Sequence, residues 1–479
     1  NSMSKIEVNT VDVQCGSTLT LGSSGKTVTL APGAAQSGFG RTGTVDWQTT
    51  VKTTAFTAAS GEGYFVNTTS GDIVVTLPTG SAGDIIAVKD YAGTFDTNQC
   101  KLNPSGSDKI NGVADDAFLT QQGLSVTLVF LDSTKGWLAV NDSTNDTTGI
   151  IPAFISATGG NATITCGDFK THIFTSSGTF CVSNAGNAGG SNKVDYFVVA
   201  GGGGGSGVKK AGGGSGGFRL SNEYGLPAPL NSPLISSTGI TVTATGIPVT
   251  IGAGGSGGPG AAPTKGSTGS NTIFSTITSA GGGFGDANPV TPAPDRAGGS
   301  GGGAGDGGGC TTGGAGNTPP VSPPQGNSGG NARPGGNPGL PAGGGGAGAV
   351  GSNGATPGSP GVQAPGGIGS FIDANFIGPT APSYGEAGPV SNTRYFAGGG
   401  GGGGNGSPPA GGGIGGGGNG GGSSSSPPVP VSERTGEAGA TNTGGGGGGA
   451  GCQHGPSGGP CRTGGAGGSG IVMIRYKFQ

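Results

Sequence analysis

Residues 195–207 read DYFVVAGGGGGSG, so a pattern typical of a buried strand passes without any turn into five consecutive glycines. The chain leaves glycine just as abruptly at its other end, where residues 464–479 read GGAGGSGIVMIRYKFQ. Residues 201–479 hold 94 of the 119 glycines of the chain. The sequence therefore predicts one extended glycine region enclosed by two β-strands.

Glycine on this scale without a strict period is typical of low-complexity sequence, and the unbroken run at 398–404 excludes the Gly-X-Y repeat of collagen. We interpret the region as polyglycine II, a left-handed helix with three residues per turn, a rise of about 3.1 Å and no internal hydrogen bonds. Its N–H and C=O groups point outward, so packed copies can satisfy one another only where no Cβ intervenes.

Two sequence patterns distinguish surrounded helices from helices at the rim of such a bundle. Unbroken runs at 398–404 and 444–449 predict helices surrounded by others. Triplets in which every third residue carries a side chain predict rim helices: Ala253, Ser256 and Pro259, and again Thr463, Ala466 and Ser469.

The closing strand, 471–478, alternates between two faces. Ile471, Met473 and Arg475 share one face, and Val472, Ile474 and Tyr476 share the other. We predict that this strand pairs with the strand at 196–200, so that one small sheet receives both ends of the glycine region.

The first 200 residues are expected to be β-rich. Residues 44–149 are predicted to form an all-β domain, either a sandwich or a barrel, because short β-branched runs alternate with turn residues. We expect Trp47 and Trp137 to anchor its core, and 115–123 is the one candidate for a helical turn. Further strands over 150–200 lead into the glycine region at 201–479.

Residues 1–43 form a separate N-terminal segment. Within residues 18–30, two alternating apolar runs place Leu19 and Leu21 nine residues before Val28 and Leu30. Because so short a repeat cannot bury its own apolar face, we interpret it either as a trimerising stem or attachment segment, or as a hairpin at the edge of the next domain. The predicted fold class of the whole chain is mainly β, with almost no α-helix.

Composition excludes several classes of function. The formal net charge is −3 and charged residues make up 9% of the chain without a basic cluster, which excludes nucleic acid as a partner. No window approaches 18 apolar residues, so no membrane insertion is predicted. The first residues lack the apolar segment of a signal peptide, and with Met3 as initiator we expect synthesis in the cytoplasm.

The reactive side chains do not form a recognisable catalytic or metal site. The seven cysteines are too sparse for a disulfide scaffold; Cys166 could pair with Cys181, and Cys452 with Cys461, but we expect mostly free, buried thiols. Residues 452–461 lack zinc-finger spacing, so no metal or cofactor is predicted.

No paired carboxylates suited to glycan cleavage stand out in the sequence. Asp115 and Asp116 are neighbours in a turn, and only His172 and His454 could supply an imidazole base. We therefore predict that the chain is not an enzyme and has no catalytic residues.

The segments between the glycine runs hold most of the aromatic residues, prolines and charges of this region. Four of them span 218–237, 286–296, 371–396 and 423–437. Loops on a rigid scaffold commonly carry recognition, so we select these candidates for receptor contact: Tyr224, Phe371, Phe376, Tyr384, Arg394, Tyr395 and Phe396. The alternative for each aromatic residue is that its ring packs the loop onto the glycine lattice.

The framing strands, the glycine runs and the N-terminal modules together resemble bacteriophage tail-fibre and adhesin proteins, including those of phages of aquatic bacteria. The motifs that carry the resemblance are VDYFVVAGGGGG, the terminal GGAGGSGIVMIRYKFQ, SGFGRTGTVDW and GYFVNTTSGDIVVTLP. The resemblance implies a polyglycine II sandwich whose variable distal loops bind a receptor. It also implies a homotrimer attached to the virion by its N-terminus. The longer, proline-rich interruptions of this chain depart from that pattern.

Taken together, these features predict a virion tail-fibre protein. Its N-terminal part would attach to other virion proteins, and loops of its glycine-rich domain would bind a glycan or an outer-membrane protein on the host. The alternative is a purely structural fibre or decoration protein of the virion, or a self-assembling extracellular filament, that binds no receptor.

Overall fold

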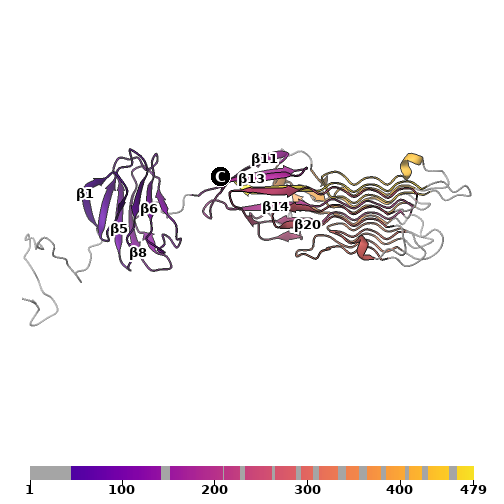
Figure 1. Cartoon of the computed structure of the whole chain (residues 1–479), viewed down its shortest axis with the longest axis horizontal. Helices are drawn as coiled ribbons and strands as arrows, with labels where there is room; N and C mark the ends of the chain where they lie inside the picture. The colour runs from indigo at the N-terminus through magenta and orange to yellow at the C-terminus, as the bar shows by residue number, and fades with distance from the viewer. Residues whose placement is uncertain are drawn as a thin grey trace, which may run out of the picture. The chain divides into compact units, whose positions relative to one another are not determined.

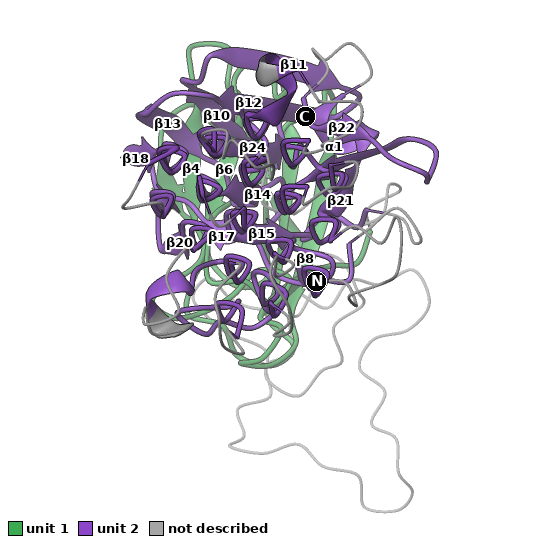
Figure 2. Cartoon of the chain, turned by 90° about the vertical axis from the view of Figure 1, so that its right-hand side faces the viewer, with its two compact units in different colours: residues 1–150 green, residues 151–479 purple. Residues whose placement is uncertain are grey.

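The computed structural model describes thirteen stretches of the chain: residues 45–141, 152–208, 210–226, 232–261, 265–286, 293–305, 312–332, 341–354, 364–378, 384–404, 409–422, 430–452 and 461–479. The predicted N-terminal segment at 1–43 lies outside them. The chain divides into two units, Asn1–Ile150 and Ile151–Gln479, so the predicted strand region at 150–200 and the glycine region belong to one unit (Figures 1 and 2).

The first unit is a sandwich of two sheets, one of the two forms that the sequence left open. One sheet has the order β1-β3-β5-β8-β9 and the other β2-β4-β6-β7. Its strands are β1 Asp46–Lys52, β2 Phe56–Thr57, β3 Glu62–Val66, β4 Ile73–Thr76, β5 Ile85–Asp90, β6 Cys100–Asn103, β7 Ala117–Leu119, β8 Ser125–Phe130 and β9 Trp137–Ala139.

Successive strands of this unit alternate between the two sheets. β1, β3 and β5 are parallel neighbours in one sheet, and β2, β4 and β6 are parallel neighbours in the other, so the chain coils around a single core. β7, β8 and β9 then close the sheets with antiparallel pairing. Strands β4, β6, β7 and β8 contribute every second side chain to the core, as the alternating pattern predicts.

Two expectations for this unit need correction. Trp137 is fully buried in the core as predicted, but Trp47 is 38% exposed. It lies over Gly63, which has no side chain to displace it, and its ring centroid is 5.0 Å from that of Phe65. The helical turn expected at 115–123 is strand β7 instead, because Ala117 and Leu119 fill the core alternately.

The second unit begins with three layers of β-structure. Its strands are β10 Ile155–Thr158, β11 Ala162–Cys166, β12 Phe169–Phe174, β13 Gly178–Ala185, β14 Lys193–Val199, β15 Phe218–Ser221, β16 Ile235–Ser236, β17 Ile240–Thr241, β18 Gly246–Thr250, β19 Thr272–Phe274, β20 Ile277–Ser279, β21 Ser370–Asp373, β22 Glu386–Ala387, β23 Thr393–Phe396 and β24 Ile471–Lys477. Its short helices are η1 Ala293–Arg296, α1 Ala374–Ile377 and η2 Val431–Arg434.

The central sheet, β11-β12-β24-β14-β15-β16, confirms the predicted pairing of the two framing strands. β14 and β24 are antiparallel, with Asp195 opposite Arg475 and Val199 opposite Ile471. On one face, Val472, Ile474 and Tyr476 join the core shared with the sheet β10-β13-β18-β19-β20. On the other, Ile471 and Met473 join the core shared with β21, β23 and α1.

From this sheet end, extended glycine-rich segments run side by side to the opposite end of the unit (Figure 1). We call each segment a crossing, the array of crossings the lattice, and the end away from the sheets the far end. β14 passes directly into the crossing at 200–206, and the crossing at 462–470 passes directly into β24.

The hydrogen bonds of the lattice have the threefold pattern of polyglycine II. Along residues 201–206, three successive N–H groups donate to three different neighbouring crossings, and the next three return to the same crossings in the same order, at 2.8–3.1 Å. The carbonyls of these residues accept from three further crossings at 2.8–2.9 Å. The neighbours are residues 211–217, 251–259, 265–271, 280–286, 444–451 and 462–470. Figure 2 looks down the crossings and shows this packing.

Sterics explain why these positions are glycine. A Cβ on Gly203 would lie 2.1 Å from the carbonyl oxygen of Gly283, and Gly201, Gly202, Gly204 and Gly205 meet equally close carbonyls at 2.0–2.1 Å. The predicted rim triplets are confirmed, because the side-chain-bearing residues are exposed: Ala253, Ser256, Pro259, Thr463 and Ala466, with Ser469 half-buried.

The cysteines agree only in part with the expectation of mostly free, buried thiols, and Cys15 and Cys310 lie outside the described residues. Cys452 and Cys461 form a disulfide between two adjacent crossings at the far end. Cys100, Cys166 and Cys181 are free, and only Cys100 is fully buried. Cys166 and Cys181 lie on strands of different sheets, β11 and β13, so their proposed pairing does not occur.

Candidate functional site

The segments that interrupt the glycine runs lie at both ends of the lattice. The segments at 218–237 and 371–396 contain β15, β16, β21, β22 and β23, which belong to the sheet end. The described parts of 286–296 and 423–437 adjoin the far end, where a hydrogen bond links Asp286 to Gly303 and another links Gly451 to Arg434. Six of the seven predicted site residues therefore lie in the sheet-end segment 371–396.

These six residues are brought together by a small sheet with the order β21-β23-β22. Phe371 lies opposite Tyr395 in the β21–β23 pair, with their ring centroids 5.2 Å apart. Asp373 caps α1 by accepting a hydrogen bond from the Asn375 backbone N–H at 2.9 Å. The sheet and α1 form one small module on the central sheet.

Three of the candidates pack inward rather than toward a ligand. Phe376 and Phe396 are fully buried and Tyr395 is 6% exposed. Phe396 lies 4.8 Å from Phe197 of β14, centroid to centroid, in an edge-to-face arrangement. Phe376 and Phe396 fix the module onto the central sheet, while the Tyr395 ring packs against Phe371 within the module. For these three residues the structure agrees with the packing alternative, because burial leaves little ring surface for a receptor.

Phe371, Tyr384 and Arg394 are half-buried on the module's surface. The Arg394 side chain donates to the backbone carbonyl of Tyr384 at 2.8 Å and also to that of Gly385. These bonds hold the segment before β22 against β23, so Arg394 has a positioning role within the module. Phe371 and Tyr384 retain accessible ring surface.

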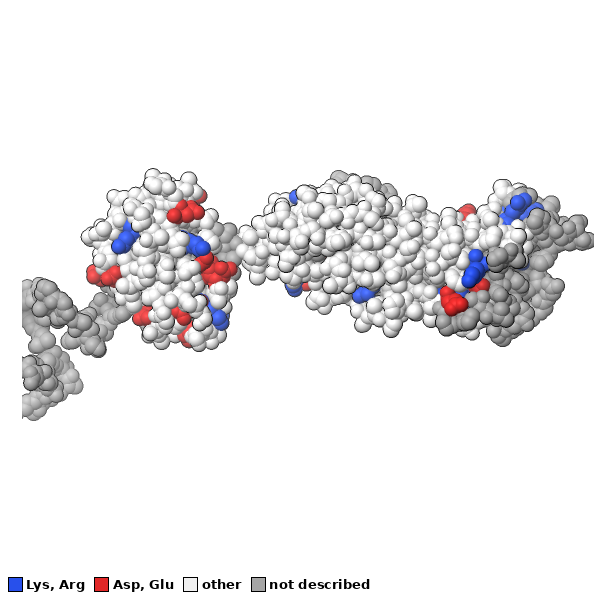
Figure 3. Space-filling model, in the orientation of Figure 1, with Lys and Arg blue, Asp and Glu red and all other residues white. Residues whose placement is uncertain are grey.

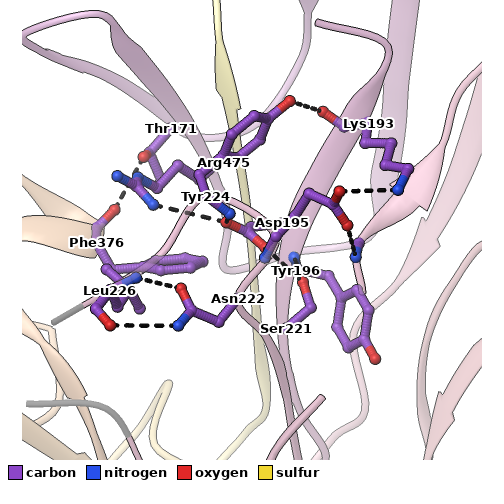
Figure 4. A network of polar contacts seen from close by, with 12 residues as sticks. Thr171, Lys193, Asp195, Tyr196, Ser221, Asn222, Tyr224, Leu226, Phe376 and Arg475 are labelled. Carbon is purple, nitrogen blue, oxygen red and sulfur yellow. Dashed lines mark hydrogen bonds and ion pairs between the residues drawn. The ribbon is translucent and has the colours of Figure 1, made fainter. Parts of the chain in front are cut away.

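Tyr224 lies apart from the module's surface, in a polar network around Asp195 (Figure 4). Its hydroxyl donates to the Lys193 carbonyl at 2.6 Å, and its ring lies 5.4 Å from that of Phe169. The same hydroxyl is half-buried, and burial raises the pKa of Tyr224 above its ordinary value. Tyr224 therefore closes one side of the network instead of standing free.

The network is built on a buried ion pair that the sequence analysis missed. An oxygen of Asp195 lies 3.6 Å from Arg475 Nη1, and the side chains are 0% and 9% exposed. Asp195 also accepts from the Ser221 hydroxyl at 2.8 Å and the Glu223 N–H at 2.6 Å. Arg475 stacks on the Phe169 ring, with its guanidinium carbon 3.8 Å from the ring centroid.

Burial governs the titration of both members of the pair. It raises the pKa of Asp195 above its ordinary value, against the opposing hydrogen bonds and the Arg475 charge. Burial likewise lowers the pKa of Arg475, against the Asp195 charge. The Thr171 hydroxyl donates to the Phe376 carbonyl at 2.9 Å beside the pair, so the network ties β12, β14 and β24 to the aromatic module (Figure 4).

His172 lies on the other face of the central sheet and is held as a neutral ring. Its Nδ1–H donates to the Gly159 carbonyl at 2.7 Å, and Nε2 accepts from the Tyr476 hydroxyl at 3.0 Å. The side chain is buried, and burial lowers the pKa of His172 below its ordinary value. It is a structural histidine rather than an exposed base.

This environment predicts a loss of stability in mild acid. Because the folded-state pKa of His172 lies below the unfolded value, its stabilising contribution is complete above about pH 6.5 and is lost as the pH falls through the folded pKa. The loss attributable to one proton is at most about 1.4 kcal/mol per pH unit. Unfolding free energies from pH 8 to pH 5 should fall more steeply for the native chain than for His172→Gln; parallel profiles would contradict the assignment.

Other reactive groups do not assemble into a site within the described residues. That part of the chain holds no group of three or more His, Cys, Asp or Glu residues positioned to bind a metal ion. Asp116 pairs with Lys101 and accepts a hydrogen bond from Asn103 at 2.6 Å, as expected of a surface carboxylate. His454 lies outside the described residues. None of the described helices is long and apolar enough to span a bilayer.

A family model for a glycine-rich domain matches residues 175–477, from just before β13 to the end of β24. The match therefore covers the module of β21, β22, β23 and α1, the lattice, and the central sheet apart from β11 and β12. No curated protein matches the chain.

Proposed function

The chain belongs to the glycine-rich domain family. From its sequence resemblance to tail-fibre and adhesin proteins, we propose that it is a tail-fibre protein of a bacteriophage that recognises the surface of the host cell. In this proposal the N-terminal part attaches to the virion and the glycine-rich unit carries recognition. The chain acts as a homotrimer, as its resemblance to tail fibres implies. It performs no catalysis.

The observation that carries the proposal is that the lattice holds the far ends of neighbouring crossings together. Neighbouring crossings are joined at the far end by hydrogen bonds from Ala450 to Ser206, from Gly403 to Lys210 and from Gly404 to Gly421, at 2.7–2.9 Å. In the sequence, the crossings are separated by segments that differ in composition, such as 333–340 and 423–429. A rigid scaffold whose crossings are separated by unlike segments suits recognition.

The sheet-end module offers less surface for this role than the sequence suggested, because Phe376, Tyr395 and Phe396 are buried. We therefore assign recognition to the segments that separate the crossings in the sequence, with Phe371 and Tyr384 as the remaining sheet-end candidates. The structural alternative, a fibre or decoration protein without a receptor, requires the lattice but places no demand on the composition of these segments.

The test measures binding of the full chain to cells of candidate hosts. In separate variants, residues 333–340, 355–363, 405–408, 423–429 and 453–460 are replaced by Gly-Ser linkers of equal length. We expect saturable binding that blocks phage adsorption and is lost in at least one variant. A matched control replaces the two exposed rim residues Ala253 and Pro259 by serine and should bind normally.

Saturable binding by the native chain with no loss in any linker variant would contradict the assignment to these segments. A folded native chain that binds no host infected by the parent particle would instead favour the structural alternative. Sedimentation of the full chain as a monomer would remove the trimer from the proposal.

A further inference from the structure

One flank of the lattice carries a groove with a volume of about 740 Å³. It follows three neighbouring segments at 312–318, 325–332 and 349–354. The middle segment is bonded to both others: the Gly316 N–H donates to the Ser328 hydroxyl oxygen at 3.3 Å, and the Gly351 N–H donates to the Ser328 carbonyl at 3.0 Å. The groove is thus a straight trough over the rim of the lattice.

The side chains that line the groove stand in columns with a period of three residues. Thr312 and Ala315 form one column, Ser328 and Asn331 the second, and Val350 and Asn353 the third, and all of them are exposed. Thr318 lines the groove beyond a bend of the first segment at 316–319, where Asn317 has a φ of 49°. A rise of about 3.1 Å per residue separates the two members of a column by roughly 9 Å. A straight ligand lying along the second and third segments would meet an asparagine side chain on each.

The groove presents hydrogen-bond donors and no charge. Asn331 Oδ1 accepts from the Gly313 N–H at 2.8 Å, and Asn353 Oδ1 accepts from the Asn331 N–H at 2.7 Å. Each of these amide oxygens thus accepts a hydrogen bond within the lattice. The Nδ2 groups of Asn331 and Asn353 donate to no other described residue. The backbone N–H groups of Ala315, Ser328 and Val350 likewise have no acceptor in the described part of the chain.

The lining also offers a small apolar contact. Val350 is 62% exposed and stands at the end of the third column. None of the lining residues is charged, and the lattice face shown in Figure 3 is likewise almost free of charge between the sheets and the far end. A ligand matched to this groove is straight, uncharged, rich in acceptors and partly apolar on one face.

We propose that this groove binds a neutral, linear glycan. Sugar hydroxyl and ring oxygens accept from the Asn Nδ2 and backbone N–H donors, and a face of sugar C–H groups packs on Val350. An anionic polymer would find no cation among the lining residues to compensate its charge, and a hydrocarbon ligand, which has no acceptor, would leave the free donors unpaired. The site lies on the flank and does not depend on the tail-fibre proposal.

The test uses the purified full chain and purified sugars without cells. Neutral linear oligosaccharides of graded length are titrated by calorimetry, beside anionic oligosaccharides of the same lengths. Affinity for at least one neutral series should rise with length and level off once the sugar spans the groove. The anionic series should bind at least about tenfold more weakly, because the groove has no compensating charge.

Two variants address the groove itself. Asn331→Asp with Asn353→Asp keeps both Oδ1 acceptors that the lattice uses, removes both Nδ2 donors, and should weaken binding by about tenfold or more. Ala315→Trp places an indole in the groove and should abolish binding. Ala466→Trp, at an exposed position of another rim column, is the matched control and should bind as the native chain does.

Three results would overturn the proposal. They are the absence of binding by every neutral series, equal binding by the native chain and both groove variants, and equal affinity for anionic and neutral sugars. If a second copy of the chain occupies the groove instead, no neutral sugar series will bind. The chain will then self-associate in a concentration-dependent way, and Ala315→Trp will abolish that association. Host-cell binding that survives the groove variants would leave the proposed function intact.

Discussion

Replacing Gly203 with alanine is expected to lower the free energy of unfolding of the glycine-rich unit by about 3 kcal/mol or more. The new Cβ would lie 2.1 Å from the Gly283 carbonyl oxygen, and no flexible side chain is present there to move aside. Relief requires two crossings to separate. Separation would weaken the hydrogen bonds that Gly203 makes to Gly214 and accepts from Gly447.

Calorimetric unfolding, together with hydrogen exchange of residues 201–206, measures this loss. Ala253→Val is the matched control, because Ala253 is exposed on a rim crossing and a larger side chain there meets solvent; its effect should stay within about 0.5 kcal/mol. Both tryptophans, Trp47 and Trp137, lie in the other unit, so tryptophan fluorescence should not respond to Gly203→Ala. A Gly203→Ala chain as stable as Ala253→Val would show that the lattice is looser than its geometry implies.

The second large effect is expected from removing the charge of Asp195. Asp195→Asn preserves the shape and the acceptor used by Ser221, but leaves the Arg475 guanidinium buried without its counter-charge. Breaking a buried pair in this way typically costs about 3–5 kcal/mol. Because Arg475 keeps its stacking contact with Phe169, we expect the lower end of that range.

A double variant separates the charge effect from a packing effect. Asp195→Asn combined with Arg475→Met removes both charges and should recover most of the lost stability, since an uncharged pair of similar volume needs no compensation. The unfolding free energies of the two single variants, the double variant and the native chain complete the cycle. Additive losses across this cycle would mean that the two side chains stabilise the sheet independently.

The two strands that enclose the glycine region could be predicted from the sequence, because the patterns that indicate them lie within short stretches of the chain. The alternation in 471–476 fixes which side chains share a face of β24, and the cores on the two faces contain the residues that the alternation assigns. Glycine runs and triplets likewise report whether a crossing is surrounded or at the rim, since the requirement for no Cβ acts residue by residue.

Features that depend on residues far apart in the sequence could not be predicted. Alternation with a period of two is the same in parallel and antiparallel strands. The sequence pattern of the first unit therefore could not predict that its strands pair in parallel and coil around one core. Asp195 and Arg475 are 280 positions apart and meet only because β14 pairs with β24. The burial of Phe376 and Phe396 follows from how α1 and β23 pack on the central sheet, which the composition of the segment does not encode.

The pairing of β14 with β24 has an evolutionary consequence. Everything between these strands is inserted into a single antiparallel pair, and the chain must return to the sheet end before β24 can form. Crossings are therefore gained or lost in twos, as an outward and a returning segment added at the rim. Such a pair changes neither the framing sheet nor the crossings already surrounded. Duplication and deletion can thus vary the number of exposed segments while the sheet stays constant.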